Sequence, residues 1–268
     1  MSQARWFPPL LGVALAVALT FLTLPIVAIF VDTGPGDLLA SLDDAAAVDA
    51  LTLSLWTSGL AVAIIVLVGT PAAYLLATRS FRARNLLITL IELPLVLPPA
   101  VAGIGLLAAL GPNGLFGQAL EDAGIRVVLT TASVVLALTF VAAPFYVRQA
   151  EAAFSALDRS WLDASRTLGA GEATTFMRVA IPAALPGLIA GLALAWGRAL
   201  GEFGATLMFA GSFRGVTQTV PLAIYERFAT DFTAALGLSA VLVAVSAAIL
   251  LTVKLATRAS SAPLLAAR

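Results

Sequence analysis

Residues 52–77 read TLSLWTSGLAVAIIVLVGTPAAYLLA, an apolar run without one charged side chain. An α-helix rises about 1.5 Å per residue, so roughly 20 apolar residues cross ~30 Å of hydrocarbon. The run is long enough for this, and Pro71 inside it is tolerated in a membrane, where neighbouring helices satisfy the freed backbone groups. The segment therefore predicts a transmembrane helix.

Further apolar runs of similar length lie on both sides of this segment. The chain of 268 residues is 60% hydrophobic and 11% charged, with a mean hydropathy of +1.02, whereas a soluble domain carries about 25% charged residues. We therefore expect an all-α polytopic membrane protein in which residues 1–268 form a single transmembrane domain. The six predicted spans are about 9–31, 52–77, 86–110, 127–147, 183–210 and 234–255.

The residue types that the chain lacks exclude several functions. It has no cysteine and no histidine, which excludes disulfides, thiolate or imidazole metal ligands and histidine-dependent catalysis. Lys254 is the only lysine, and no phosphate-binding loop of the form G-x-x-x-x-G-K-[ST] surrounds it. The net charge is zero, so nothing indicates nucleic-acid binding. We expect no catalytic residue, metal or cofactor on this chain, and ATP-driven work would need a separate ATPase.

Positive charge is divided unequally between the predicted loops. Eleven basic residues fall on one side of the membrane and three, Arg126, Arg214 and Arg227, on the other. Cytoplasmic loops carry the excess of Lys and Arg, so we expect a multi-pass cell-membrane protein with both termini and the loop 148–182 inside. The outer side instead collects acidic residues, which in the first loop are Asp32, Asp37, Asp43, Asp44 and Asp49.

The loop 148–182 carries a motif with defined spacing. Asp163-Ala164-Ser165 is followed after three residues by Gly169, and Val179-Ala180-Ile181-Pro182 comes nine residues later. Small side chains let a short helix seat closely in a partner's groove, and glycine ends such a helix at low steric cost. Pro182 suits the start of the next span, where a missing N–H costs nothing.

This pattern resembles the EAA signature of binding-protein-dependent ABC permeases, which reads Glu-Ala-Ala, three residues, Gly, nine residues and Ile-x-Leu-Pro. Glu151-Ala152-Ala153 spells the first letters literally, but the next glycine after it is Gly169, so that register is rejected. We expect Gly169→Asp to uncouple ATP hydrolysis from uptake and Glu151→Ala to be nearly silent. The predicted coupling residues are Asp163, Ala164, Ser165, Arg166, Leu168, Gly169, Ala170, Ile181 and Pro182.

The resemblance implies a type I ABC importer permease fold and a set of partners. Two ATPase subunits, which carry the ATP and Mg, would each bind a coupling helix. A second copy of the permease would complete the pathway in the lipid bilayer, and an extracytoplasmic oxyanion-binding protein would deliver the substrate. Taken without the motif, the loop helix is also compatible with an amphipathic helix that lies on the membrane.

Two further segments indicate the substrate class. Residues 198–206 read RALGEFGAT, and residues 95–99 read LVLPP. Together with TQTVPLAIY at 217–225, they resemble the permeases of molybdate and tungstate importers, whereas sulfate permeases tend to read Gly-Glu-Tyr-Gly at the corresponding place. The resemblance implies molybdate or tungstate import by alternating access. A sulfate or thiosulfate permease is the alternative, and a secondary transporter, which would normally show inverted repeats, is a more remote one.

Charged and proline residues inside the spans are candidates for the pathway. Arg198 and Glu202 are four residues apart, so on one helix they would share a face and pair. They would either line the external gate or brace helices within one subunit, and both interpretations stay open. Prolines 94, 98 and 99 would loosen the third span, and Glu92 near its inner end fits an interfacial carboxylate. The candidate pathway residues are Arg198, Glu202, Thr206, Pro98 and Pro99.

Overall fold

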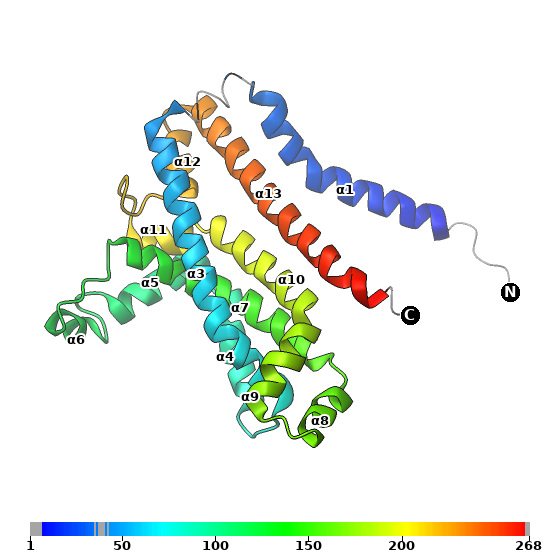
Figure 1. Ribbon diagram of the computed structural model, residues 1–268. Coiled ribbons are helices and arrows are strands. Elements are labelled where there is room, and N and C mark those ends of the chain that lie inside the picture. The colour runs from blue at the N-terminus through cyan, green and yellow to red at the C-terminus, as the bar shows by residue number, and fades with distance from the viewer. Residues whose placement is uncertain (1–6, 35, 37–40, 42, 266–268) are drawn as a thin grey trace.

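The computed structural model describes residues 7–34, 36, 41 and 43–265 (Figure 1). Over these residues the chain is helical and forms no strand, which confirms the expected all-α architecture. Asp37 of the acidic first loop lies outside the described residues. The elements are α1 (Phe7–Asp32), α3 (Ala45–Thr78), α4 (Arg84–Val96), α5 (Pro99–Leu110), α6 (Gly117–Asp122), α7 (Thr131–Ser155), α8 (Arg159–Thr167), α9 (Glu172–Thr175), the π-helix η1 (Phe176–Ala180), α10 (Ile181–Leu200), α11 (Gly204–Ala210), α12 (Val220–Phe228) and α13 (Phe232–Leu265).

Among the described residues, five helices are long and apolar enough to cross a membrane, and α4 with α5 makes a sixth span if the bent pair is counted as one. The predicted spans 9–31, 52–77 and 234–255 lie within α1, α3 and α13, and 127–147 overlaps α7. Pro25 and Pro71 stay inside their helices, as a membrane environment permits.

The third predicted span, 86–110, is not one continuous helix. It is divided into α4 and α5, whose axes are bent by 115°. Pro98 and Pro99 have no N–H to continue the ladder, and Leu97 before them is extended, with φ −68° and ψ 130°. The expected unwinding is confirmed at residues 97–98, whereas Pro94 remains inside α4.

The fifth predicted span, 183–210, is also two helices. Helix α10 ends at Leu200, and α11 begins at Gly204 after a short break. At its other end the helix starts before residue 183, because α9, η1 and α10 follow one another without a gap from Glu172. The break at 201–203 contains no proline, so the apolar pattern alone did not indicate it.

The core forms where α3, α7 and α10 pack together. Small residues allow the helices to approach closely: a Cβ atom at Gly69 would lie 3.0 Å from the ring of Tyr146, and one at Gly187 would lie 2.4 Å from the Cβ of Ala153. Buried hydroxyls add a polar link, since Thr70 Oγ1 and Tyr146 Oη are 2.6 Å apart. These contacts make α3, α7 and α10 the frame for both ends of the molecule.

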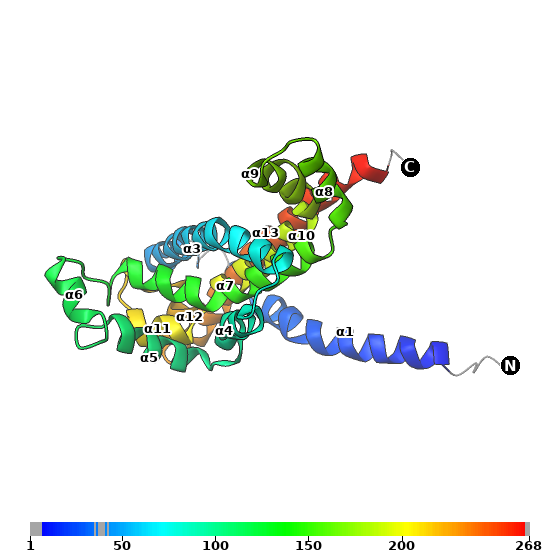
Figure 2. The same cartoon turned by 90° about the horizontal axis from the view of Figure 1, so that it is seen from below.

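Figure 1 shows α8, α9 and the turn between α3 and α4 at one end of this frame, and α12 at the opposite end. Helix α1 runs beside α13 and projects away from the other helices in both views (Figures 1 and 2). Its side chains are largely exposed, for example Phe21 and Val31 at 75% each. Such an apolar surface fits contact with lipid or another membrane subunit.

Candidate functional site

Helix α8 contains the first part of the predicted coupling motif, from Asp163 to Arg166, whereas Ile181 and Pro182 begin α10. Local signals define the start of α8. Asp158 is the N-cap, and its Oδ1 accepts a hydrogen bond from the backbone N–H of Ser160 at 2.9 Å. This donation, with a weaker contribution from the Ser160 hydroxyl, holds the pKa of Asp158 below its ordinary value. The cap therefore stays ionised near neutral pH, where its charge also favours the N-terminus of the helix.

The last residue of α8 is Thr167, and Gly169 terminates the helix just beyond it, as the sequence predicted. Gly169 has φ +86°, a conformation that costs glycine little. The N–H of Gly169 donates to the carbonyl of Arg166 at 2.9 Å, and the N–H of Ala170 donates to the carbonyl of Ser165 at 3.1 Å. This pair of bonds is a Schellman motif, which satisfies carbonyls at the end of α8.

Helix α8 has one anchored side and one open side. Leu162 is buried in the core cluster formed by α3, α7 and α10, whereas Trp161 is 55% exposed and Leu168 is 88% exposed. Ser165 Oγ lies 3.0 Å from Thr175 Oγ1 and links α8 to α9. Within the predicted motif, Asp163, Ala164, Arg166, Gly169 and Pro182 are also exposed, and Ser165, Ala170 and Ile181 are half-buried.

Ion pairs join α8 to its neighbours at this end of the molecule. Arg166 pairs with Asp163 at 3.1 Å and with Glu172 of α9 at 3.4 Å. Glu172 also pairs with Arg79, at the turn between α3 and α4, at 3.3 Å. A half-open pocket of about 520 Å³ lies between α8 and this turn, and four arginines, Arg79, Arg84, Arg159 and Arg166, are in its wall together with Asp163. Arginine thus dominates the pocket wall, while Glu172 pairs with Arg79 and Arg166 and Glu151 pairs with Arg84.

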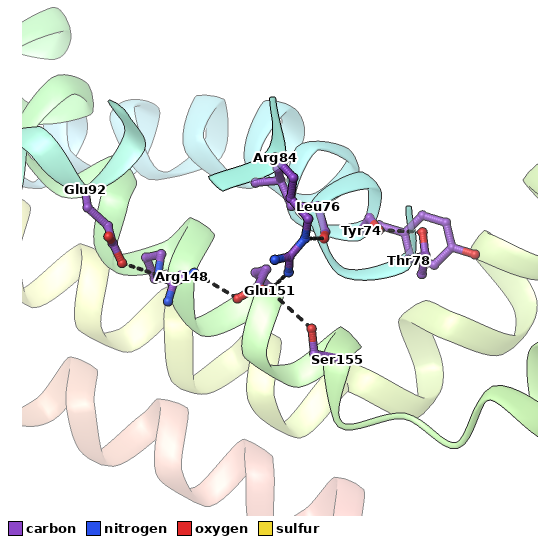
Figure 3. Close-up of polar contacts among 8 residues, drawn as sticks. All are labelled: Tyr74, Leu76, Thr78, Arg84, Glu92, Arg148, Glu151 and Ser155. Carbon is purple, nitrogen blue, oxygen red and sulfur yellow. Dashed lines mark hydrogen bonds and ion pairs between the residues drawn. The ribbon is translucent and has the colours of Figure 1, made fainter. Parts of the chain in front are cut away.

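Glu151 is the centre of a second group of ion pairs, which the sequence motif did not indicate (Figure 3). Its side chain is only 9% exposed, and both carboxylate oxygens are occupied: Oε1 lies 2.9 Å from Arg84 Nη2, and Oε2 lies 2.9 Å from Arg148 Nη1. Arg148 also pairs with Glu92 of α4 at 2.8 Å. The sequence signal that could have indicated this group is the i,i+3 spacing of Arg148 and Glu151 at the end of an apolar run.

These contacts change one expectation and support another. Glu151 lies on α7, which agrees with excluding it from the coupling helix. Its ion pairs nevertheless make it improbable on physical grounds that Glu151→Ala is nearly silent, as we expected from the sequence. Removing one member of a buried charge group leaves its partners uncompensated and is usually strongly destabilising. Glu92 has 39% of its side chain exposed and pairs with Arg148, which suits the expected carboxylate near the inner end of the third span.

The predicted pair Arg198 and Glu202 forms, although not within one helix. Arg198 Nη2 and Glu202 Oε2 are 2.6 Å apart, without the alignment of a hydrogen bond. Glu202 is buried in the break after α10, and its Oε1 accepts a hydrogen bond from the N–H of Ala205 at 2.8 Å. The carboxylate thus holds the first turn of α11, while the side chain of Arg198 remains 27% exposed.

The two broken spans meet at their breaks. A Cβ atom at Gly204 would lie 3.0 Å from the Cβ of Pro99, and one at Gly103 would lie 2.6 Å from the carbonyl oxygen of Ala205. Thr206, also predicted as a pathway residue, is fully buried on α11. The structure therefore brings the Pro98–Pro99 segment and the Glu202–Thr206 segment to one place, between α5 and α11.

A bundle of membrane-length helices, with two broken spans in contact and a capped helix at one end, defines a polytopic membrane protein. The family described as "Binding-protein-dependent transport system inner membrane component" matches residues 66–261. The chain belongs to this family.

Curated proteins and solved structures agree with this assignment. Over 251 residues, 93% of each chain, the sequence is 43% identical to the molybdenum transport system permease protein ModB of Mycobacterium tuberculosis. It is 36% identical over 186 residues to the sulfate transport system permease protein CysT of Salmonella typhimurium, covering 69% of this chain and 67% of that protein. A bacterial ABC transporter involved in the import of alginate is similar with a TM-score of 0.73 and 16% identity, over 94% of this chain and 95% of that chain. The chain thus has the type I ABC importer permease fold.

Proposed function

We propose that this chain is the permease subunit of an ATP-driven importer of molybdate or tungstate. The observation that carries the proposal is the 43% identity to a molybdenum permease over 93% of both chains. The secondary-transporter alternative is set aside, because the chain belongs to a binding-protein-dependent family. Two copies of the chain would form the pathway, with the termini and α8 on the cytoplasmic side.

The ATPase subunit would bind α8. Trp161 and Leu168 offer exposed apolar contacts, and the caps at Asp158 and Gly169 keep the helix formed before the partner arrives. Such preorganisation lowers the entropic cost of association. ATP and Mg would be bound by that partner, whose closure would draw the two coupling helices together and open the outer mouth of the pathway.

The binding protein would dock on the opposite end. Asp44 pairs with Arg227, and Asp49 pairs with Arg214 at 3.6 Å. These ion pairs join the first loop to residues 211–232, the two segments that we expect to form the docking surface. They also hold two of the three predicted outer arginines at this end, and it is the small number of arginines there that supports an outer location.

Arg198 is the proposed pathway residue at the breaks. Glu202 has a bracing function through the N–H of Ala205. Its other carboxylate oxygen pairs with Arg198, so a passing dianion would compete with Glu202 for the partly exposed guanidinium. The test is Arg198→Gln in the reconstituted complex. Unchanged uptake together with unchanged basal ATPase activity would contradict the pathway function.

The substrate is tested on the binding protein encoded with this permease, titrated calorimetrically with molybdate, tungstate and sulfate. We expect tight binding of molybdate and tungstate and weak binding of sulfate, followed by ATP-dependent uptake of the same anions into proteoliposomes. A preference for sulfate would favour the alternative that the 36% identity to a sulfate permease supports. A sulfate result would overturn the molybdate assignment.

A further inference from the structure

Helix α4 has little apolar anchorage for a helix that begins a membrane span. All of its residues are described, and none of them is buried. Ile88 and Ile91 are only partly buried against the core cluster. Besides these two apolar contacts, charged side chains on either side of them attach α4 to its neighbours.

Those contacts attach α4 to α7 at two points (Figure 3). Arg84, in the first turn of α4, binds the buried carboxylate of Glu151 and donates from Nε to the carbonyl of Leu76 on α3 at 2.7 Å. Glu92, further along α4, binds Arg148 at 2.8 Å. Because Arg148 also binds Glu151, the carboxylate of Glu151 holds both arginines and thereby both ends of this attachment.

The coupling helix reaches the same place from the other side. Arg166 of α8 pairs with Glu172, and Glu172 pairs with Arg79. Between Arg79, the C-cap of α3, and Arg84, the first residue of α4, the chain has only residues 80–83. A displacement of α8 that pulls on Glu172 therefore acts on the turn that leads directly into α4, the inner half of the broken span.

We infer that Glu151 is a positioning residue for coupling: it clamps α4 to α7, so that a displacement of α8 is passed through Arg79 and the 80–83 turn to the α4–α5 break. The inference rests on the proposed function, because it requires an ATPase that moves α8. The outer half of the span, α5, packs on α11 beside Glu202. The clamp thus connects the coupling helix to the two breaks at the proposed pathway.

The test is the number of oxyanions imported per ATP hydrolysed by the whole complex, reconstituted with its ATPase and binding protein. Glu151→Gln keeps the shape of the side chain and removes its charge. We expect this ratio to fall by about five-fold or more, the order of typical coupling between sites. Glu121→Gln, on α6 and outside the ion-pair group, is the matched control and leaves the ratio unchanged. A Glu151→Gln complex whose ratio stays at the wild-type value overturns the inference, whatever its yield, because a merely structural effect lowers the amount of active complex and not the ratio.

A second set of variants tests the link through the exposed pair, where folding is not at risk. Arg79→Glu and Glu172→Arg each place like charges together and are expected to lower the ratio, whereas Arg79→Lys keeps the positive charge beside Glu172 and is expected to preserve it. No loss in the two charge-reversal variants overturns the relay through Arg79. Since the ratio is measured with whichever oxyanion the purified binding protein carries, a sulfate result would overturn the molybdate proposal and leave this test intact.

Discussion

At Gly169 the termination of α8 depends on one backbone angle. Its φ of +86° is unfavourable for side chains, but a Cβ atom there would meet nothing within 4 Å. A substitution therefore costs conformational energy, about 1–2 kcal/mol for most residues, and causes no clash. Asn tolerates this region better than Ala, and Asp has nearly the shape of Asn with a charge added.

We expect substitutions of Gly169 to weaken ATPase binding and coupling least for Asn, more for Ala and most for Asp. Gly169→Asp adds a negative charge at the C-terminus of α8, where carbonyl dipoles already point, and Asp163 lies on the same short helix. The measurements are the binding of the purified ATPase subunit and the number of oxyanions imported per ATP hydrolysed, and both should follow this order. Equal loss for Asn and Asp would show that the backbone angle alone matters and that the charge does not.

Asp44 is expected to make the α12 end sensitive to acid. The hydrogen bond from Arg227, and next the N–H of Ala46, lower the pKa of Asp44 from its ordinary value of 3.8. A carboxyl with a lowered folded pKa stabilises the folded state fully above its unfolded pKa and loses this contribution as the pH falls through the folded pKa. Asp44→Asn can still cap α3, so it removes only the charge. We expect the variant to melt below the wild type at pH 6 and together with it well below pH 3.8, by thermal unfolding; a constant difference would contradict this.

Among the elements, the contact between α5 and α11 offers a matched pair of glycines. A Cβ atom at Gly103 would lie 2.6 Å from the backbone oxygen of Ala205, whereas one at Gly105 would meet nothing within 4 Å. Both lie in the same helix, so Gly→Ala improves the helix propensity of each by about 1 kcal/mol. We expect Gly105→Ala to be neutral or stabilising. Gly103→Ala should separate α5 from α11 and lower uptake, because the backbone of Ala205 cannot be displaced without a large cost in free energy. Normal uptake by Gly103→Ala would contradict this packing.

The elements that could be predicted from the sequence are those with local causes. Gly169 ends α8 through its own φ, and Pro98 with Pro99 interrupts the third span because both lack an N–H. The break at 201–203 was missed, since it lies in an apolar run without proline and is held by Glu202, which bonds to Ala205. The Glu151 group was missed because Arg84 and Glu151 are distant in the chain and meet only through packing of α4 on α7.

At the scale of the whole molecule, charge is arranged differently at the two ends. At the α8 end four arginines line one pocket, and Glu172 and Glu151 pair with three of them. At the α12 end Arg227 and Arg214 are paired with Asp44 and Asp49. A membrane protein inserts with its excess of positive charge in the cytoplasm. We therefore expect the α8 end to face the cytoplasm, where an ATPase would reach it, and the α12 end to face a binding protein.

This orientation is open to a direct test because the chain contains no cysteine. Arg82→Cys places a thiol in the exposed turn between α3 and α4, and Thr230→Cys places one in the exposed junction of α12 and α13. We expect a membrane-impermeant maleimide to label Thr230→Cys in intact cells and Arg82→Cys only after permeabilisation. The wild-type chain is the unlabelled control, and double labelling in permeabilised cells shows that both thiols are reactive. Labelling of Arg82→Cys but not of Thr230→Cys in intact cells would reverse the orientation and place α8 beyond the reach of a cytoplasmic ATPase.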